Sequence, residues 1–568
     1  MASGADGRVW GDSCRANLSP LSYDGIFSAA ISAPNLEELR LMPFNPLLLS
    51  VGLLFAFSLG LLVIRLGRAR FAYFWLLSAL CALTVWTLVL LSRAGLSQTF
   101  PFSAWGMPAL GVLPPLLLLD PASWGFAFSL SALLLAVILT DVVRPHTAVW
   151  STWAAALALT GFGLLTALAG NPLMLILAWA ALDFFELLVQ FWYIRNEGER
   201  QKVVLQFSLR AVSFFFLLWA WLSAGEAGRL ATFGQLPRSV GVLLLLAGWV
   251  RLSVVCLPAF PGVEPSAPHS LSVLMRLIAG TAGLIPIVRA AEIGVMEAQV
   301  LPLLLLAGLV GLVSGISWLF SADEWEGQRY WLGAVSALAV AAAARAQPGG
   351  SLVWALAGVL AAGLIGIYSA RARPLTILLG LSLLMISGLP FSLTWNAAAL
   401  YAAPATLLAL PLIVVQSLLL AGYFRLAWQS GEALEGAERW VILVYSWGLA
   451  LLIVAQALLA WLENLEGSAL VTPLRLQPLL PGVMASILAV GWVYLTQRLA
   501  APGERWIAIL RLVRPLNWLG GLLTVLDRLL GRAAALVAIA LEGEGGILWA
   551  LLWLVLLFAV IARGGLGG

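Results

Sequence analysis

Long apolar runs recur along this chain and limit it to one class of structure. From about residue 45 onward, runs of about 20 apolar residues follow one another, each long enough to cross roughly 30 Å of hydrocarbon as a helix. Hydrophobic residues make up 62% of the 568 residues and charged residues only 10%, which lies far outside the soluble globular range. The sequence therefore predicts an all-α polytopic membrane protein with about sixteen transmembrane helices.

The charged residues divide this apolar chain into segments. Residues 1–44 are expected to form a polar N-terminal tail or a surface helix, because their charges lack the order of a signal peptide. Residues 45–115 and 431–498 carry spans. The segment 499–545 places arginines opposite leucines and tryptophans, which is typical of an amphipathic helix on the membrane surface. A terminal span is expected over 546–568.

The basic residues predict an orientation in the membrane. Of the 31 basic residues only Lys202 is a lysine, so the positive-inside rule rests on arginine. With the N-terminus outside, cytoplasmic loops hold about twice as many basic residues as external loops do. We therefore expect a multi-pass protein of the inner (cytoplasmic) membrane of a prokaryote, with its N-terminus outside.

Metal, haem, nucleotide and nucleic-acid binding are not indicated. Cys14, Cys81 and Cys256 are scattered without a CxxC pair, and His146 and His269 are the only histidines. The sequence has no GxxxxGK[ST] motif and no GxGxxG between a strand and a helix. The net charge of +4 is small for this length. We expect no cofactor and no nucleic-acid partner.

Short motifs stand in order between residues 116 and 430. They are LLLLDPASWGFAFSL (116–130), NPLMLILAW (171–179), the run from WVRLSVVCLPAFPGVEPSAPHSLSVLM to IVR (249–289), EGQRYWLGAVSAL (326–338), GLPFSLTW (388–395) and YFRLAW (423–428). This order resembles that of the antiporter-like membrane subunits shared by respiratory complex I, membrane-bound hydrogenases and Mrp-type cation/proton antiporters. The motif positions of this family are occupied by Asp120, Pro261, Pro268, Gly388 and Pro390.

The resemblance implies an architecture and a function. It implies two inverted five-helix repeats, over 116–290 and 291–430, with broken helices in the seventh and twelfth spans. The extra spans and the surface helix further resemble the distal, longest subunit type of complex I (NADH:quinone oxidoreductase). Such a subunit moves protons or monovalent cations, has other membrane subunits and the lipid bilayer as partners, and is at most a non-catalytic subunit of an oxidoreductase complex.

The residues of the implied ion path depart from the family pattern in the first half. Where the fifth span should carry a glutamate stands Ala180, with Asp183 and Glu186 one and about two turns further on. Asp183 is equally a candidate for function and for a structural pair. Where the seventh span should carry a lysine stands Arg251, which keeps its proton at any accessible pH. Arg210 is expected to form a fixed ion pair with one of the carboxylates.

The eighth and twelfth spans depart from the pattern as well. Arg276 stands where the family often has histidine. Its permanent charge suits a fixed electrostatic role better than proton transfer. His269 has two interpretations. It is either a proton-transfer group or a residue at a helix start whose hydrogen-bonding groups are satisfied. No Asp, Glu, Lys, Arg or His stands between Arg373 and Arg425. The second half of a path is therefore missing or is carried by water and polar groups such as Ser387, Ser392, Thr394, Asn396 and Tyr401.

Two further expectations complete the sequence-based hypothesis. Tryptophans near predicted span ends, including Trp150, Trp153, Trp249, Trp318 and Trp331, are interpreted as interfacial anchors. The leading functional hypothesis is a proton- or cation-translocating subunit acting through Asp183, Glu186, Arg210, Arg251, His269 and Arg276. The alternatives are a non-conducting structural paralogue that scaffolds such an assembly, and an unrelated transporter or membrane-embedded transferase.

Overall fold

The computed structural model describes most of the chain between Asn45 and Leu499. The described residues are 45–68, 71–101, 114–143, 149–194, 196–225, 232–256, 267–321, 324–368, 375–401, 406–429, 438–466 and 476–499. The predicted N-terminal tail, surface helix and terminal span lie outside these residues, and so does Pro261. The interpretations that rest on them stay predictions.

Long helices account for nearly all of the described residues. The first eight are α3 (Pro46–Gly67), α4 (Phe74–Leu91), α5 (Pro121–Thr140), α6 (Trp150–Ala167), α7 (Pro172–Tyr193), α8 (Glu197–Ser223), α10 (Arg238–Cys256) and α11 (His269–Ile293). They are followed by α12 (Glu297–Leu319), α13 (Glu324–Ala344), α14 (Pro348–Ile367), α15 (Thr376–Met385), α16 (Thr406–Ala427), α17 (Arg439–Glu466) and α18 (Leu476–Leu499). Within the described residues, 11 helices are long and apolar enough to cross a membrane. The all-α polytopic fold is confirmed, whereas the number of sixteen spans stays a prediction.

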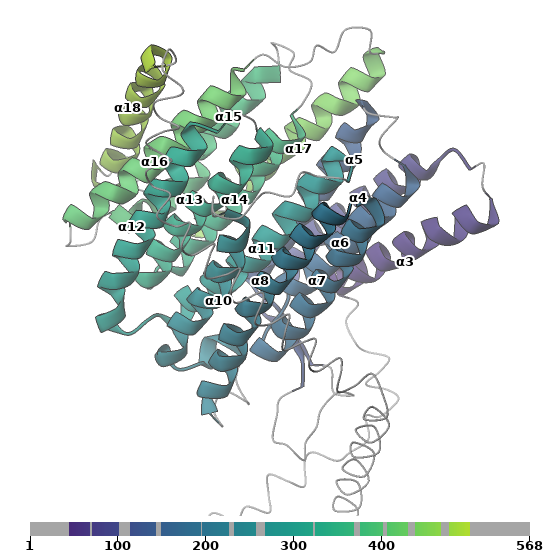
Figure 1. Cartoon of the computed structure of the whole chain (residues 1–568), viewed down its shortest axis with the longest axis horizontal. Helices are drawn as coiled ribbons and strands as arrows, with labels where there is room; N and C mark the ends of the chain where they lie inside the picture. The colour runs from purple at the N-terminus through teal and green to yellow at the C-terminus, as the bar shows by residue number, and fades with distance from the viewer. Residues whose placement is uncertain are drawn as a thin grey trace, which may run out of the picture. The chain divides into compact units, whose positions relative to one another are not determined.

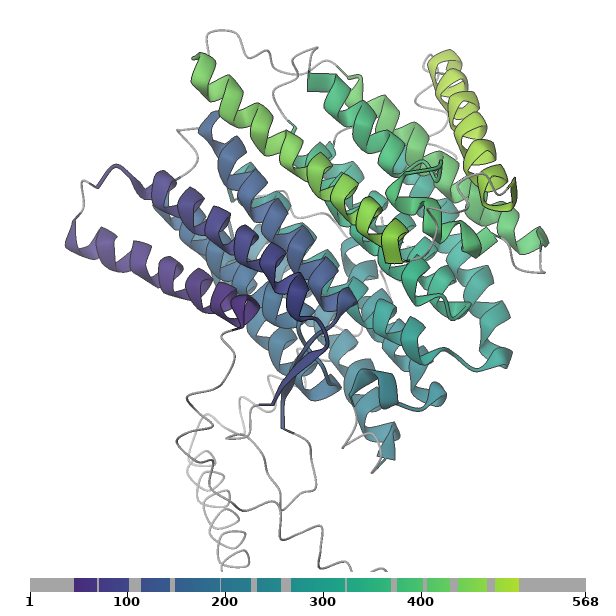
Figure 2. The ribbon, with the colours of Figure 1, turned by 180° about the vertical axis from the view of Figure 1, so that it is seen from behind.

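The long helices run side by side, with α3 and α18 at opposite edges in both views (Figure 1, Figure 2). The helices differ in burial. All residues in the most apolar 18-residue stretch of α14 are buried, against 94% in α11 and 22% in α18. The mean hydropathy of these stretches is 2.0 in α14, 1.9 in α11 and 1.8 in α18, so hydropathy does not predict which helix is buried. Whether an apolar helix faces protein or lipid therefore depends on its neighbours, which the local sequence does not specify.

Prolines and capping side chains fix where the central helices begin. Pro121 and Pro172 open α5 and α7, where a missing N–H is not needed. The side chain of Asp120 accepts a hydrogen bond from the Ser123 amide at 2.8 Å, and that of Asn171 accepts one from the Met174 amide at 2.9 Å. These caps fix the starts of α5 and of α7, the helix that carries Asp183 and Glu186.

A small β-hairpin lies beside these helix starts and was not expected from the sequence. β1 (Gln98–Pro101) pairs antiparallel with β2 (Leu116–Leu119), with Gln98 opposite Leu119. The run LLLL is apolar throughout, so it reads equally well as part of a span. Its backbone is satisfied from both sides, since the Leu118 amide donates to the Leu168 carbonyl at 2.8 Å. The hairpin ties the end of α6 to the start of α5.

The predicted break in the twelfth span is present. α15 ends at Met385, and the chain passes through Gly388 and Phe391, both with positive φ, before the 3₁₀ helix η7 (Leu393–Tyr401). Pro390 lies in this break, as the motif implies. A Cβ on Gly388 would in addition clash with the side-chain amide of Gln416, so glycine is needed there both for its backbone conformation and for space. In the seventh span, α10 is continuous up to Cys256, and the proline-bearing residues that follow lie outside the described ranges.

Two of the tryptophans interpreted as interfacial anchors are core residues instead. Trp318 and Trp331 are 1% and 2% exposed, and their rings meet at 5.2 Å between centroids. Trp331 donates to the Gly358 carbonyl at 2.8 Å, and Trp318 donates to the Leu419 carbonyl at 3.0 Å. Each indole N–H therefore has a buried acceptor, which permits burial of the whole ring. The anchor interpretation is wrong for these two residues and for Trp249, which is 6% exposed.

Candidate functional site

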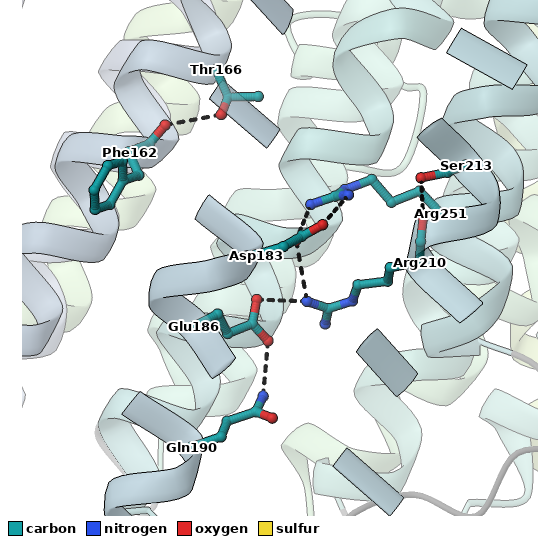
Figure 3. A network of polar contacts seen from close by, with 8 residues as sticks. All are labelled: Phe162, Thr166, Asp183, Glu186, Gln190, Arg210, Ser213 and Arg251. Atoms are coloured by element: carbon teal, nitrogen blue, oxygen red, sulfur yellow. Dashed lines mark hydrogen bonds and ion pairs between the residues drawn. The ribbon is translucent and has the colours of Figure 1, made fainter. Parts of the chain in front are cut away.

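Four of the six predicted path residues meet in one buried network between α7, α8 and α10 (Figure 3). Asp183 and Arg251 are 2% and 1% exposed and form a bidentate ion pair, with 2.8 Å from Arg251 Nη1 to Asp183 Oδ2. Arg210 Nη1 donates to Glu186 Oε2 at 2.6 Å and lies 3.7 Å from Asp183 Oδ1. The expected pairing of Arg210 with a carboxylate is confirmed, and Arg210 reaches both carboxylates.

Helix geometry explains why these side chains converge. Asp183 and Glu186 are three residues apart on α7 and therefore share one helix face, with Gln190 one turn further on. Gln190 donates to the second oxygen of Glu186 at 2.9 Å. On α10, a Cβ on Gly248 would clash with the backbone of Gly283, so its glycine lets α10 approach α11 closely. Arg251 lies one turn after this contact.

The network is balanced in charge and has unused donors. Two arginines face two carboxylates, which is the condition for burying charges in an apolar environment. The guanidinium carbon of Arg251 also lies 4.4 Å from the centroid of the Trp179 ring. In the described part of the chain, the Nε atoms of Arg210 and Arg251 and the indole nitrogen of Trp179 have no acceptor. The site thus holds its charges as paired groups, and three of its buried donors have no acceptor among the described residues.

A small cleft leads from this network to the surface between α7 and α8. Glu186, Gln190, Gln206 and Arg210 contribute its polar lining. The surrounding helix faces are apolar and exposed, with Phe184 60% and Phe215 70% exposed. Glu186 lies seven residues before the end of α7, and Arg210 lies four residues after Gln206, where the apolar part of α8 begins. A polar opening therefore interrupts an apolar face within the membrane-spanning parts of both helices.

The two other predicted path residues, His269 and Arg276, lie apart from this network. His269 is the first residue of α11, and its Nε2 lies 2.7 Å from the Gly366 carbonyl at the end of α14. Arg276 hydrogen-bonds the Trp325 carbonyl and lies 3.4 Å above the Trp325 ring. Both side chains connect α11 to neighbouring segments. A role for them in ion movement stays a prediction, and their contacts show how each is held.

A second buried ion cluster joins the start of α5 to the end of α11. Arg289, 2% exposed, forms an ion pair with Asp120 and donates to Ser123 Oγ at 2.8 Å and to Glu292 at 3.0 Å. Burial raises the pKa of Asp120, but the charge of Arg289 and the hydrogen bonds from Arg289 and Ser123 hold this pKa below its usual value. The motifs contained Asp120 and Arg289 separately. Their pairing across 169 positions had no local signal.

The second half buries polar groups without charge. Gln416 accepts from Tyr401 Oη at 2.7 Å and donates to the Ser387 carbonyl at 3.0 Å, beside the break after α15. Ser382 and Gln456 form a second pair, 3.0 to 3.1 Å apart. Sequence reasoning named Tyr401 and Ser387 but missed Gln416, Gln456 and Ser382. Their signal was the presence of amide side chains inside otherwise apolar spans, where an unpaired amide is costly.

No protein-family model and no curated protein sequence matches the chain. Solved structures are similar to it. A chain of the Mrp complex from Dietzia sp. DQ12-45-1b matches with a TM-score of 0.64 and 14% identity, covering 91% of this chain and 63% of that one. A chain of the membrane-bound sulfane sulfur reductase (MBS), an archaeal respiratory membrane complex, matches with a TM-score of 0.60 and 13% identity, covering 90% and 99%.

A third similar chain belongs to respiratory complex I from Thermus thermophilus with bound aureothin. Its TM-score is 0.53 at 18% identity, and the match covers 75% of this chain and 99% of that one. The present chain spans 63% of the length of the Mrp chain and nearly the full length of the other two. The fold implied by the sequence motifs is thereby confirmed, at low sequence identity. The chain is a multi-pass membrane protein whose fold is similar to that of membrane subunits of Mrp, complex I and MBS assemblies.

Proposed function

We propose that the chain is an antiporter-like subunit of a multi-subunit membrane assembly and moves protons or monovalent cations through its first half. The observation that carries this proposal is the position of Arg210 between two carboxylates, 2.6 Å from Glu186 and 3.7 Å from Asp183. A cation that contacts both carboxylates can shift between them with a small movement. Buried ionisable groups in a membrane span are costly and mark ion pathways.

The chemistry assigns the mobile proton to the carboxylates. Arginine keeps its proton, so Arg210 and Arg251 cannot release one. A carboxylate that loses its arginine partner in an apolar site becomes easier to protonate, because nothing then compensates its charge. Movement of Arg210 toward Asp183 would leave Glu186 to take up a proton. Arginine thus sets which carboxylate is charged, and the carboxylate carries the proton.

The cleft between α7 and α8 supports neighbouring membrane subunits as partners. Hydrocarbon offers no hydrogen-bond partner to Glu186, Gln190 or Arg210, so lipid is a poor neighbour for this opening. Glu186 and Arg210 lie within the membrane-spanning parts of α7 and α8, so the neighbour that meets them is either hydrocarbon or another protein. A helix of another subunit with a polar side chain at that depth would satisfy it.

A second candidate function is a non-conducting scaffold within the same kind of assembly. Arginine instead of lysine at position 251 and the lack of charged residues between Arg373 and Arg425 favour it. On this reading the network holds α7, α8 and α10 together and carries nothing. The two candidates agree on the assembly and differ on whether a proton enters the network.

Ion movement measured with the assembled complex in proteoliposomes separates the two. We expect Asp183→Asn to reduce proton uptake by at least about tenfold, equivalent to roughly 1.4 kcal/mol, because Arg210 then has no second carboxylate to move to and stays paired with Glu186. Asp141→Asn is the matched control, since Asp141 is also a buried carboxylate, 4% exposed, but lies outside the network. Unchanged uptake in Asp183→Asn and Arg251→Ala, with both complexes intact, would leave the scaffold as the function.

A further inference from the structure

An apolar groove lies between α15, α16 and α18, at the edge of the molecule marked by α18 (Figure 1, Figure 2). Its volume is about 360 Å³, which lies within the range of about 300 to 1,000 Å³ typical of small-molecule sites. Leu384 lines it from α15, Leu420 and Phe424 from α16, and Val490 and Val493 from α18. The groove is separate from the ion network in the first half.

The lining of the groove accepts only an apolar ligand. Its two hydroxyl groups, those of Ser387 and Ser486, each donate at 2.8 Å to a carbonyl of the preceding turn. The groove opens on membrane-spanning helices, and Leu384 and Val490 are 54% and 71% exposed. Apolar cavities stay dry, so the medium that meets this groove in a bilayer is hydrocarbon. A linear hydrocarbon chain is the ligand that such a groove accommodates.

Hydrocarbon contact alone does not retain such a ligand. An acyl chain is as apolar in the bilayer as in the groove, so moving it between them gains no hydrophobic free energy. Stable occupancy needs an additional contact that the free lipid lacks. A charged headgroup bound at the end of the groove provides one.

Two arginines stand where such a headgroup would lie. α16, α17 and α18 are successive spans, so α16 and α18 run in the same direction and end on the same side of the membrane. Arg425 lies in the last turn of α16 and directly follows Phe424, which lines the groove. Arg498 lies in the last turn of α18, two turns after Val490 on the same ridge, with Tyr494 between them.

Both guanidinium groups lack an acidic partner in the part of the chain that the structure describes. Arg425 donates to the Ser321 carbonyl, and its Nε has no acceptor among the described residues. Arg498 lies 4.8 Å above the Tyr494 ring. Two arginines that have no carboxylate partner among the described residues, in the last turns of two helices that line an apolar groove, are complementary to a lipid with an anionic headgroup.

We propose that this groove holds one acyl chain of an anionic phospholipid whose phosphate is bound by Arg425 and Arg498. The chain occupies the space between α15, α16 and α18 and packs next to the helix break at Gly388. Such a lipid fills the gap that the short helix α15 leaves beside α16. It links the end of α18 to the centre of the second half.

The test measures phospholipid retained by the full chain in its assembly. The complex is purified in mild detergent from membranes that contain phosphatidylglycerol and phosphatidylethanolamine, and bound lipid is quantified by native mass spectrometry. Leu420→Trp fills the groove, and Leu410→Trp is its control, because Leu410 lies on the same helix, 47% exposed, outside the groove. The double variant Arg425→Gln/Arg498→Gln removes the charges, and Arg65→Gln, in the last turn of α3, is its control.

We expect each test variant to lose bound phosphatidylglycerol roughly tenfold relative to its control, with the assembly intact. Three outcomes would overturn the proposal. Equal phosphatidylglycerol in test and control variants would show that the groove is not the site. Equal retention of phosphatidylethanolamine and phosphatidylglycerol by the wild type would show that charge does not select the lipid. Absence of any retained phospholipid in the wild type, or retention of an uncharged isoprenoid instead, would assign the groove to another occupant.

Discussion

The two halves of the molecule solve the same problem, burial of polar groups within membrane-spanning helices, with different chemistry. In the first half, charges are buried as arginine–carboxylate pairs that join α7, α8 and α10. In the second half, amides and hydroxyls are buried as neutral pairs around the break after α15. Charged pairs depend on both partners, because one partner alone is an uncompensated charge, whereas neutral pairs cost little to replace.

This difference has a consequence for ion movement. Among the described residues, the buried carboxylates all lie in the first half, whereas the buried polar groups around the break after α15 are neutral ones such as Gln416, Ser382 and Tyr401. Hydroxyls and amides can orient water but do not hold an excess proton near neutral pH. The comparison therefore predicts that substitutions in the first half alter both stability and transport, whereas those in the second half alter stability alone.

The largest effect is expected from breaking the Asp183–Arg251 pair. Arg251→Leu leaves Asp183 buried, with Arg210 at 3.7 Å as its basic neighbour. The free energy of unfolding should therefore fall by about 3 to 5 kcal/mol. The double variant Asp183→Leu/Arg251→Leu removes both charges and should recover most of that loss. Unfolding in mixed micelles measures both. If the double variant were as unstable as the sum of the single variants, the pair would not be coupled as the contacts indicate.

An intermediate effect is expected at the cluster that joins α5 to α11. Asp120→Ala removes the cap of α5 and one carboxylate of Arg289, which should cost about 2 kcal/mol in the same unfolding measurement. Glu292→Gln is the matched control, because Glu292 contacts the same guanidinium but its side chain is 27% exposed. A larger loss for the control would mean that Arg289 depends on Glu292 instead of Asp120.

The sequence predicted the participants of the first-half network better than their partners. Arg251 and Asp183 were identified from motif positions and Arg210 from the rule that membrane-buried charges pair. The bidentate contact between Asp183 and Arg251 joins residues 68 positions apart and depends on the rotation of α7 against α10, which no local pattern records. The same limit hid the Asp120–Arg289 pair. It also hid the burial of Trp318 and Trp331, because closeness to a span end does not say which face of a helix meets protein.

A smaller effect is expected from the neutral pair of Ser382 and Gln456. Ser382→Ala leaves the Gln456 amide without this partner and should cost about 1 kcal/mol. The double variant Ser382→Ala/Gln456→Leu should be nearly as stable as the wild type, because both polar groups are then gone. Proton uptake by the assembled complex should be the same in all three. Loss of uptake with retained stability would instead place a transport path in the second half and erase the contrast between the halves.

The smallest effect on stability is expected at His269. Its ring nitrogen lies 2.7 Å from the Gly366 carbonyl, a contact that the side-chain amide of glutamine can reproduce, so His269→Gln should change the free energy of unfolding by less than about 1 kcal/mol. Histidine is the side chain that changes charge between about pH 5 and 8, and glutamine does not. Proton uptake measured across that range separates the two readings of this residue. If His269 only satisfies the start of α11, the pH profiles of variant and wild type coincide. A profile that flattens in the variant would extend the ion path from the network on α7 to the start of α11, and the first half would then contain two titrating sites instead of one.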